Sequence, residues 1–131
     1  MKKLIITNLL LSQSVFAQIK FDADFESGNI NTVTTTDSVN FEVTTVSDIG
    51  GRWFYFRISG VQDTYIKVTI PTSDVNRPMY SYDDVEYVRF SETEAPEYRM
   101  FQKTFEEDTV YVAYYTPYTY SYLQKRISEW A

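Results

Sequence analysis

The stretch Trp53–Ser59, WFYFRIS, decides the fold class of this sequence. Its first half is apolar at every position, which indicates either a central strand covered on both faces or a strand with an aromatic outer face. The Gly50-Gly51 pair before it marks a turn, because glycine adopts backbone conformations that other residues avoid. The run after it, Tyr65–Ile70, alternates polar and apolar residues, which is the period of a half-buried strand.

Further runs with strand character flank this centre on both sides. They are separated by turn signals at intervals of about ten residues and lie at 19–26, 30–36, 38–46, 85–90, 98–105 and 109–115. We expect residues 71–84, which contain two prolines, to form a long loop, because proline cannot donate to a strand ladder. The pattern predicts an all-β fold, an antiparallel β-sandwich of eight or nine strands with a short C-terminal helix.

The last residues of the chain break this pattern. Pro117 ends the final strand, and Thr119 or Ser121 is a suitable N-cap for a helix over 119–131. The apolar residues of this helix that share one stripe are Leu123, Ile127 and Trp130. We therefore expect a sandwich domain over 18–118, followed by the start of a helix that leads to a domain missing from this chain.

The first residues have the layout of a secretory signal peptide. Residues 1–17 combine two lysines with a short apolar run and end on the small residue Ala17. The alternative is a first amphipathic element of the fold. A signal peptide predicts an exported bacterial protein, periplasmic or extracellular. The apolar run is too short for a permanent membrane span, so none is expected after cleavage.

Composition excludes several functions. The formal net charge of −6 makes a nucleic-acid partner unexpected, because phosphate affinity comes from Lys and Arg. Without cysteine, the core and not disulfides must stabilise the domain. Without histidine, the chain lacks the commonest general base and the usual zinc ligand. We expect no metal site, no cofactor and no catalytic residue within it.

Two residue types still suggest weaker alternatives. The acidic clusters Asp83–Glu86 and Glu106–Asp108 resemble the paired carboxylates of hydrolases, and Asp83-Asp84 also resembles a calcium site. Both clusters, however, lie in segments where solvated turns are expected. Aromatic residues on a sandwich can stack on sugar rings, although packing in the core or at an interface is the more ordinary role. The candidate platform is Trp53, Tyr55, Tyr65, Tyr80 and Tyr82.

Four stretches in order resemble one known module. They are FDADFESGN at 21–29, GRWFYFRISG at 51–60, PMYSYDDVEYVRF at 78–90 and FEEDTVYVAYYTPYTYSYL at 105–123. Together they resemble the N-terminal domain of the cytosolic carboxypeptidase-like zinc carboxypeptidases. The resemblance implies a β-sandwich that precedes a catalytic domain. The family's H-x-x-E zinc motif cannot be placed here, so no catalytic residue carries over.

The resemblance therefore implies a non-catalytic accessory domain of a secreted or periplasmic zinc carboxypeptidase that removes C-terminal residues from peptides or proteins. Its partner would be the catalytic domain in cis, and the zinc would lie in that domain. The expected contact surface is Tyr114, Tyr115, Tyr118, Tyr120, Leu123, Ile127 and Trp130. The alternatives are a free-standing secreted binding module, for example for carbohydrate, and a small hydrolase that uses carboxylates.

Overall fold

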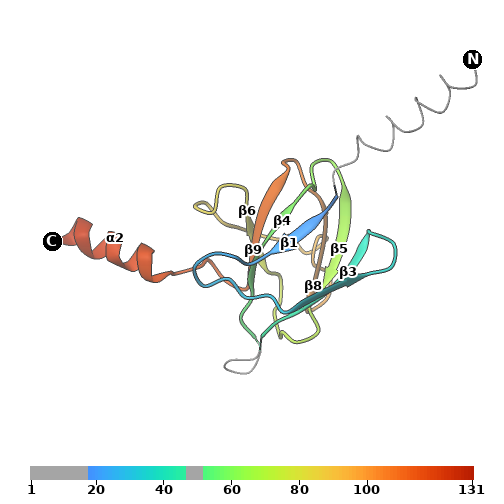
Figure 1. Cartoon of the computed structure of the whole chain (residues 1–131), viewed down its shortest axis with the longest axis horizontal. Coiled ribbons are helices and arrows are strands. Elements are labelled where there is room, and N and C mark those ends of the chain that lie inside the picture. The colour runs from blue at the N-terminus through green and yellow to red at the C-terminus, as the bar shows by residue number, and fades with distance from the viewer. Residues whose placement is uncertain (1–17, 47–51) are drawn as a thin grey trace, which may run out of the picture.

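The computed structural model describes residues 18–46 and 52–131, and its strands form two sheets packed face to face (Figure 1). The signal-peptide prediction at 1–17 and the Gly50-Gly51 turn lie outside the described residues. One sheet has five strands in the order β1-β4-β9-β6-β7. Their bounds are β1 Lys20–Asp22, β4 Tyr55–Ser59, β9 Thr109–Ala113, β6 Met79–Ser81 and β7 Val88–Arg89.

The second sheet has four strands in the order β2-β3-β5-β8. Their bounds are β2 Thr32–Thr35, β3 Asn40–Thr44, β5 Tyr65–Thr69 and β8 Met100–Thr104. The all-β sandwich prediction is confirmed, with one departure from antiparallel pairing: β3 and β5 run parallel. After β3 the chain crosses to the other sheet to form β4 and then returns to form β5. Strands β3 and β5 are therefore not joined by a hairpin and can pair in parallel.

The core lies between the sheets and is built from the inward residues of each strand. The inner strand β4 contributes Phe56 and Ile58, and its neighbour β9, the middle strand of the five, contributes Val110 and Val112, all fully buried. Aromatic rings fill the middle of this layer; the largest buried ones are Phe54, Phe56, Phe90, Phe101 and Phe105. Phe90 stacks on Phe101 with ring centroids 4.7 Å apart. This packing stabilises the domain without disulfides.

The expected loop over 71–84 contains a strand. Strand β6 pairs with β9 through Met79↔Ala113 and lies inside the five-stranded sheet, although Pro78 precedes it. Proline is tolerated at this place because it stands just before the first strand residue. The prediction of a continuous loop was therefore wrong at residues 79–81.

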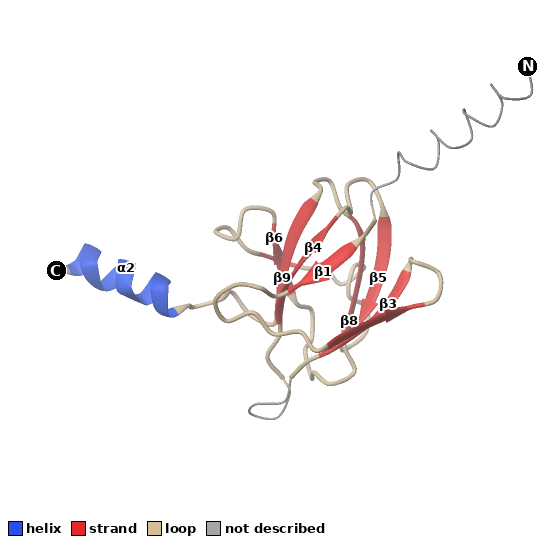
Figure 2. Ribbon diagram, viewed as in Figure 1, coloured by secondary structure: helices blue, strands red, loops and turns tan. Residues whose placement is uncertain are grey.

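The chain continues beyond β9 into a helix, α2, which spans Tyr120–Trp130. Figure 2 shows that α2 extends away from both sheets and does not cover either of them. No residue of α2 is buried. Among the described residues, no helix has the length and apolar character needed to cross a membrane.

Candidate interdomain interface

The N-terminus of α2 is well capped. Thr119 is the N-cap, in an extended conformation with φ −77° and ψ 162°, and its side chain accepts a hydrogen bond from the Tyr122 amide. The donor and acceptor are 3.1 Å apart. Of the two N-cap candidates in the sequence, the structure therefore selects Thr119. Capping satisfies amides that an isolated helix start leaves unpaired, so the helix begins at a defined residue.

A second cap comes from a distant part of the chain. The carboxylate of Glu26 accepts hydrogen bonds from the Ser121 amide at 3.0 Å and from the Ser121 hydroxyl at 2.8 Å. The bond from the Ser121 amide lowers the pKa of Glu26. Glu26 and Ser121 are 95 positions apart, and no sequence pattern links them. Sequence reasoning missed this residue for that reason.

One side of α2 carries an exposed apolar stripe. Successive helical residues turn by about 100°, so Leu123, Ile127 and Trp130 share a side, as predicted. Trp130 is 68% exposed and Ile127 is 47% exposed, whereas Leu123 is half-buried. The Arg126 guanidinium lies 5.2 Å from the Trp130 ring centroid and extends the stripe.

The predicted tyrosines do not all lie in the same environment. Tyr114 is half-buried, its ring packs edge-on against Phe54, and its hydroxyl donates to Asp74 at 2.8 Å. That hydrogen bond raises the pKa of Tyr114. The other three, Tyr115, Tyr118 and Tyr120, are exposed between the sandwich and the first turn of α2. Tyr114 thus anchors the segment to the core, whereas the other three are exposed to solvent.

The aromatic platform for sugar is not assembled. Tyr55 is buried and packs against Trp53 on the five-stranded sheet, whereas Tyr65 is exposed on the four-stranded sheet. Tyr80 and Tyr82 pack against buried Phe105 in the core. The five rings therefore do not form one flat surface, and all of them except Tyr65 pack against other rings.

The first of the two acidic clusters, at Asp83 and Asp84, is occupied by structural hydrogen bonds. Asp83 accepts from two backbone amides of its own turn, and Asp84 accepts from the hydroxyls of Tyr55 and Tyr87. Burial, and next the hydrogen bond to Asp84, raise the pKa of Tyr55 and of Tyr87. Residues 106–108 are exposed in the β8–β9 turn. Over the described parts of the chain, no three acidic side chains come together as a metal-ligand group.

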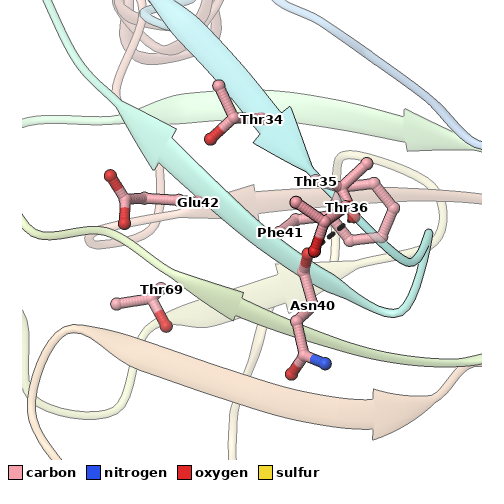
Figure 3. Close-up of a pocket in the computed structure, with 7 residues that line it drawn as sticks. All are labelled: Thr34, Thr35, Thr36, Asn40, Phe41, Glu42 and Thr69. Atoms are coloured by element: carbon pink, nitrogen blue, oxygen red, sulfur yellow. Dashed lines mark hydrogen bonds between the residues drawn. The ribbon is translucent and has the colours of Figure 1, made fainter.

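A shallow depression of about 310 Å³ lies on the outer face of the four-stranded sheet (Figure 3). Its lining is Thr34, Thr35, Thr36, Asn40, Phe41, Glu42 and Thr69. Glu42 is the one titratable group in this lining, so the depression offers no acid–base pair or nucleophile with an activating base. The exposed stripe of α2 with Tyr115, Tyr118 and Tyr120 is therefore the strongest candidate for function, as a surface for contact with another domain.

Several solved carboxypeptidases contain this fold. A metallo-carboxypeptidase from Pseudomonas aeruginosa, in complex with (2-guanidinoethylmercapto)succinic acid, matches with a TM-score of 0.70 and 24% identity. A metallo-carboxypeptidase from Burkholderia cenocepacia matches with a TM-score of 0.69 and 21% identity. The matches cover 84% and 85% of this chain, but only 33% and 32% of those chains. At this identity the likeness shows the fold.

A curated relative gives the same picture at the level of sequence. Cytosolic carboxypeptidase 3 of Bos taurus is 27% identical over 143 residues. The match covers 84% of this chain and 14% of the relative. The chain thus spans a small part of the relative and about a third of the solved carboxypeptidases.

The comparisons contradict the predicted export. The Bos taurus relative is a cytosolic carboxypeptidase, and the family model that matches residues 21–115 is described as the cytosolic carboxypeptidase N-terminal domain. Neither is a periplasmic or extracellular protein by description. The apolar run with flanking lysines at 1–17 was the whole basis of the export prediction.

The family match covers the sandwich almost completely. It begins at Phe21 in β1 and ends at Tyr115, two residues after β9, so α2 lies beyond it. It includes the stretch Trp53–Ser59 at the centre of the fold and well over half of the chain. The chain therefore belongs to the cytosolic carboxypeptidase N-terminal domain family.

Proposed function

We propose that this chain is a non-catalytic accessory domain that packs in cis against the catalytic domain of a metallo-carboxypeptidase, an enzyme that removes C-terminal residues from peptides or proteins. Membership of the N-terminal domain family supports this proposal. So do the solved relatives, in which the matched region makes up about a third of a carboxypeptidase chain. The observation that carries the proposal is the exposed apolar stripe of α2.

The residues of this chain do not fit a catalytic zinc ion. Such sites rely on histidine together with carboxylate or cysteine ligands, and the sequence contains neither histidine nor cysteine. Its carboxylates do not compensate, since the described residues bring no three of them together. We therefore assign the zinc of the parent enzyme to its catalytic domain and derive no step of catalysis from this chain.

The stripe on α2 is suited to burial. A helix of 11 residues is marginally stable in water unless one face packs against something. Full burial of a Leu, Ile or similar side chain stabilises a complex by about 1.5–3 kcal/mol relative to leaving it exposed. Leu123, Ile127 and Trp130 together can therefore supply the apolar centre of an interface between domains.

Titration calorimetry tests this proposal. The 131-residue chain is titrated into a separately produced carboxypeptidase catalytic domain from the organism that encodes it. We expect binding, and we expect the double variant Leu123→Asp/Ile127→Asp to bind at least tenfold more weakly, which corresponds to about 1.4 kcal/mol.

A matched control uses the opposite side of the same helix. The double variant Lys125→Gln/Ser128→Asp makes the chain more acidic by the same amount, but it leaves the apolar stripe intact. It should bind like the unsubstituted chain. Absence of binding by the unsubstituted chain, or equal weakening by both double variants, would overturn the proposal.

A further inference from the structure

The turn that carries Glu26 is tightly built. Within residues 23–28, the Phe25 amide bonds the Ala23 carbonyl at 2.9 Å and the Gly28 amide bonds the Phe25 carbonyl at 3.0 Å. A Cβ atom on Gly28 would lie 2.2 Å from the Ala23 oxygen, so the backbone approaches itself more closely there than any other residue permits. The turn therefore has one compact conformation.

The same turn is fixed to the five-stranded sheet. The Phe25 ring packs edge-on against Tyr55, with centroids 4.7 Å apart, and the Trp53 indole donates to the Ser27 carbonyl at 3.0 Å. The Asn29 side chain donates to the Trp53 carbonyl at 2.8 Å. Because Tyr55 begins the inner strand β4 and Trp53 lies just before it, the turn moves with the core of the sandwich.

Glu26 reaches from this fixed turn to the first turn of α2. Both of its carboxylate oxygens are used, one by the Ser121 amide and one by the Ser121 hydroxyl. The helix has no acidic residue of its own in the first turn. A carboxylate at this end favours the helix, because unpaired amides make the N-terminus partly positive. The sandwich thus supplies the charge that α2 lacks.

Packing contributes little to holding α2 in place. The helix buries none of its residues and joins the sandwich through residues 114–119. Within 18–46 and 52–131, the side-chain hydrogen bonds that connect α2 to the sandwich are those between Glu26 and Ser121. Without them, α2 would have the freedom of a helix on a short tether.

We infer that Glu26 is a latch that fixes the direction of α2 relative to the sandwich. The latch concerns this chain alone. Its consequence for the enzyme rests on the proposed function: a helix that is already held at a set angle loses less orientational freedom when its apolar stripe docks on the catalytic domain. Pre-organisation of this kind strengthens an interface by reducing the entropy lost on docking.

Distance measurements between two spin labels test the latch on the whole chain without a partner. The sequence contains no cysteine, so Thr34→Cys on β2 and Lys125→Cys on α2 give two unique labels. We expect a narrow distance distribution in the otherwise unsubstituted chain. We expect Glu26→Ala to widen it roughly twofold or more, because the helix then samples many directions. Circular dichroism and urea unfolding check that the sandwich remains folded.

Two further variants make the test decisive. Ser121→Ala removes one of the two hydrogen bonds from the helix side and should widen the distribution less than Glu26→Ala. Asp24→Ala removes a neighbouring carboxylate that forms no hydrogen bond to α2 in the described structure, and it should change nothing. A broad distribution in the unsubstituted chain, or an unchanged one in Glu26→Ala, overturns the latch. Since no catalytic domain is present, this result is independent of the docking test.

Discussion

Asp22 and Arg57 join the edge strand β1 to the neighbouring strand β4. The carboxylate oxygens of Asp22 accept from Arg57 Nε at 3.0 Å and from Nη2 at 2.7 Å, which is a bidentate pair. The guanidinium also lies 5.5 Å from the centroid of the Phe25 ring. Strand β1 has three residues, so a single pair of this kind is a large part of what attaches it.

Asp22→Asn should therefore destabilise the domain in a pH-dependent way. Burial raises the pKa of Asp22, but the hydrogen bonds and charge of Arg57 outweigh this effect and lower it overall. A lowered pKa in the folded state stabilises the protein above the ordinary pKa of Asp, near 4, and this stabilisation is lost as the pH falls below that value. At pH 7 we expect a loss of about 1–2 kcal/mol in the free energy of unfolding.

Urea unfolding at pH 7 and pH 3 measures this effect. The difference between Asp22→Asn and the unsubstituted chain should shrink at pH 3, because below the ordinary pKa of Asp the unfolded chain binds a proton at Asp22 and part of the stabilisation is lost. An equally large difference at both pH values would contradict the assignment to the ion pair.

Gly28→Ala should destabilise the turn at residues 23–28. The new Cβ atom would meet a backbone oxygen, which cannot move aside like the end of a flexible side chain. We expect a loss of about 1–3 kcal/mol in urea unfolding. Ser27→Gly is the control in the same turn: Ser27 has a φ of 66°, which glycine adopts freely, so its effect should stay within about 0.5 kcal/mol. Equal effects of the two would argue against a close approach at Gly28.

At the scale of elements, the sequence pattern predicted strands better than their pairing. The alternation in β3 and β5 follows directly from burial of one face, as in Phe41 and Val43 or Ile66 and Val68. Strand β6 was not predicted from the sequence for two reasons. Pro71 and Pro78 both favour a loop, and the pairing of β6 with β9 depends on tertiary context. The parallel pairing of β3 with β5 depends on which sheet β4 enters, and local patterns do not determine that.

Helix α2 should be dispensable for the stability of the sandwich. Deletion of residues 118–131 removes no buried side chain, so the free energy of unfolding should change by less than about 1 kcal/mol. Trp53 remains in the truncated chain and reports unfolding by fluorescence. Phe101→Ala is the positive control, since it empties a fully buried site and should cost about 3–5 kcal/mol. A truncation effect of that size would show that α2 belongs to the sandwich.

On the scale of the whole molecule, helical periodicity predicted the stripe of Leu123, Ile127 and Trp130, and the structure leaves Ile127 and Trp130 exposed. The contact between Glu26 and Ser121 could not be predicted, because it depends on where a turn and a helix start meet in space. The separation of the five rings of the predicted sugar platform could not be predicted either, because strand order, and not residue type, decides which rings lie on the same face of a sheet.

The chain by itself should have no carboxypeptidase activity. With zinc and a peptide present, mass spectrometry should show no release of C-terminal residues, since the sequence has no histidine to form the metal site. Release of a C-terminal residue that a chelator abolishes would contradict the accessory role.

Hydrogen–deuterium exchange with and without the bound carboxypeptidase catalytic domain tests the central claim most directly. The claim is that α2 docks through its apolar stripe. It predicts that amides in residues 120–130 exchange at least tenfold more slowly in the complex, while those of the four-stranded sheet are unchanged. Unchanged exchange in α2, or protection confined to the four-stranded sheet, would contradict the claim.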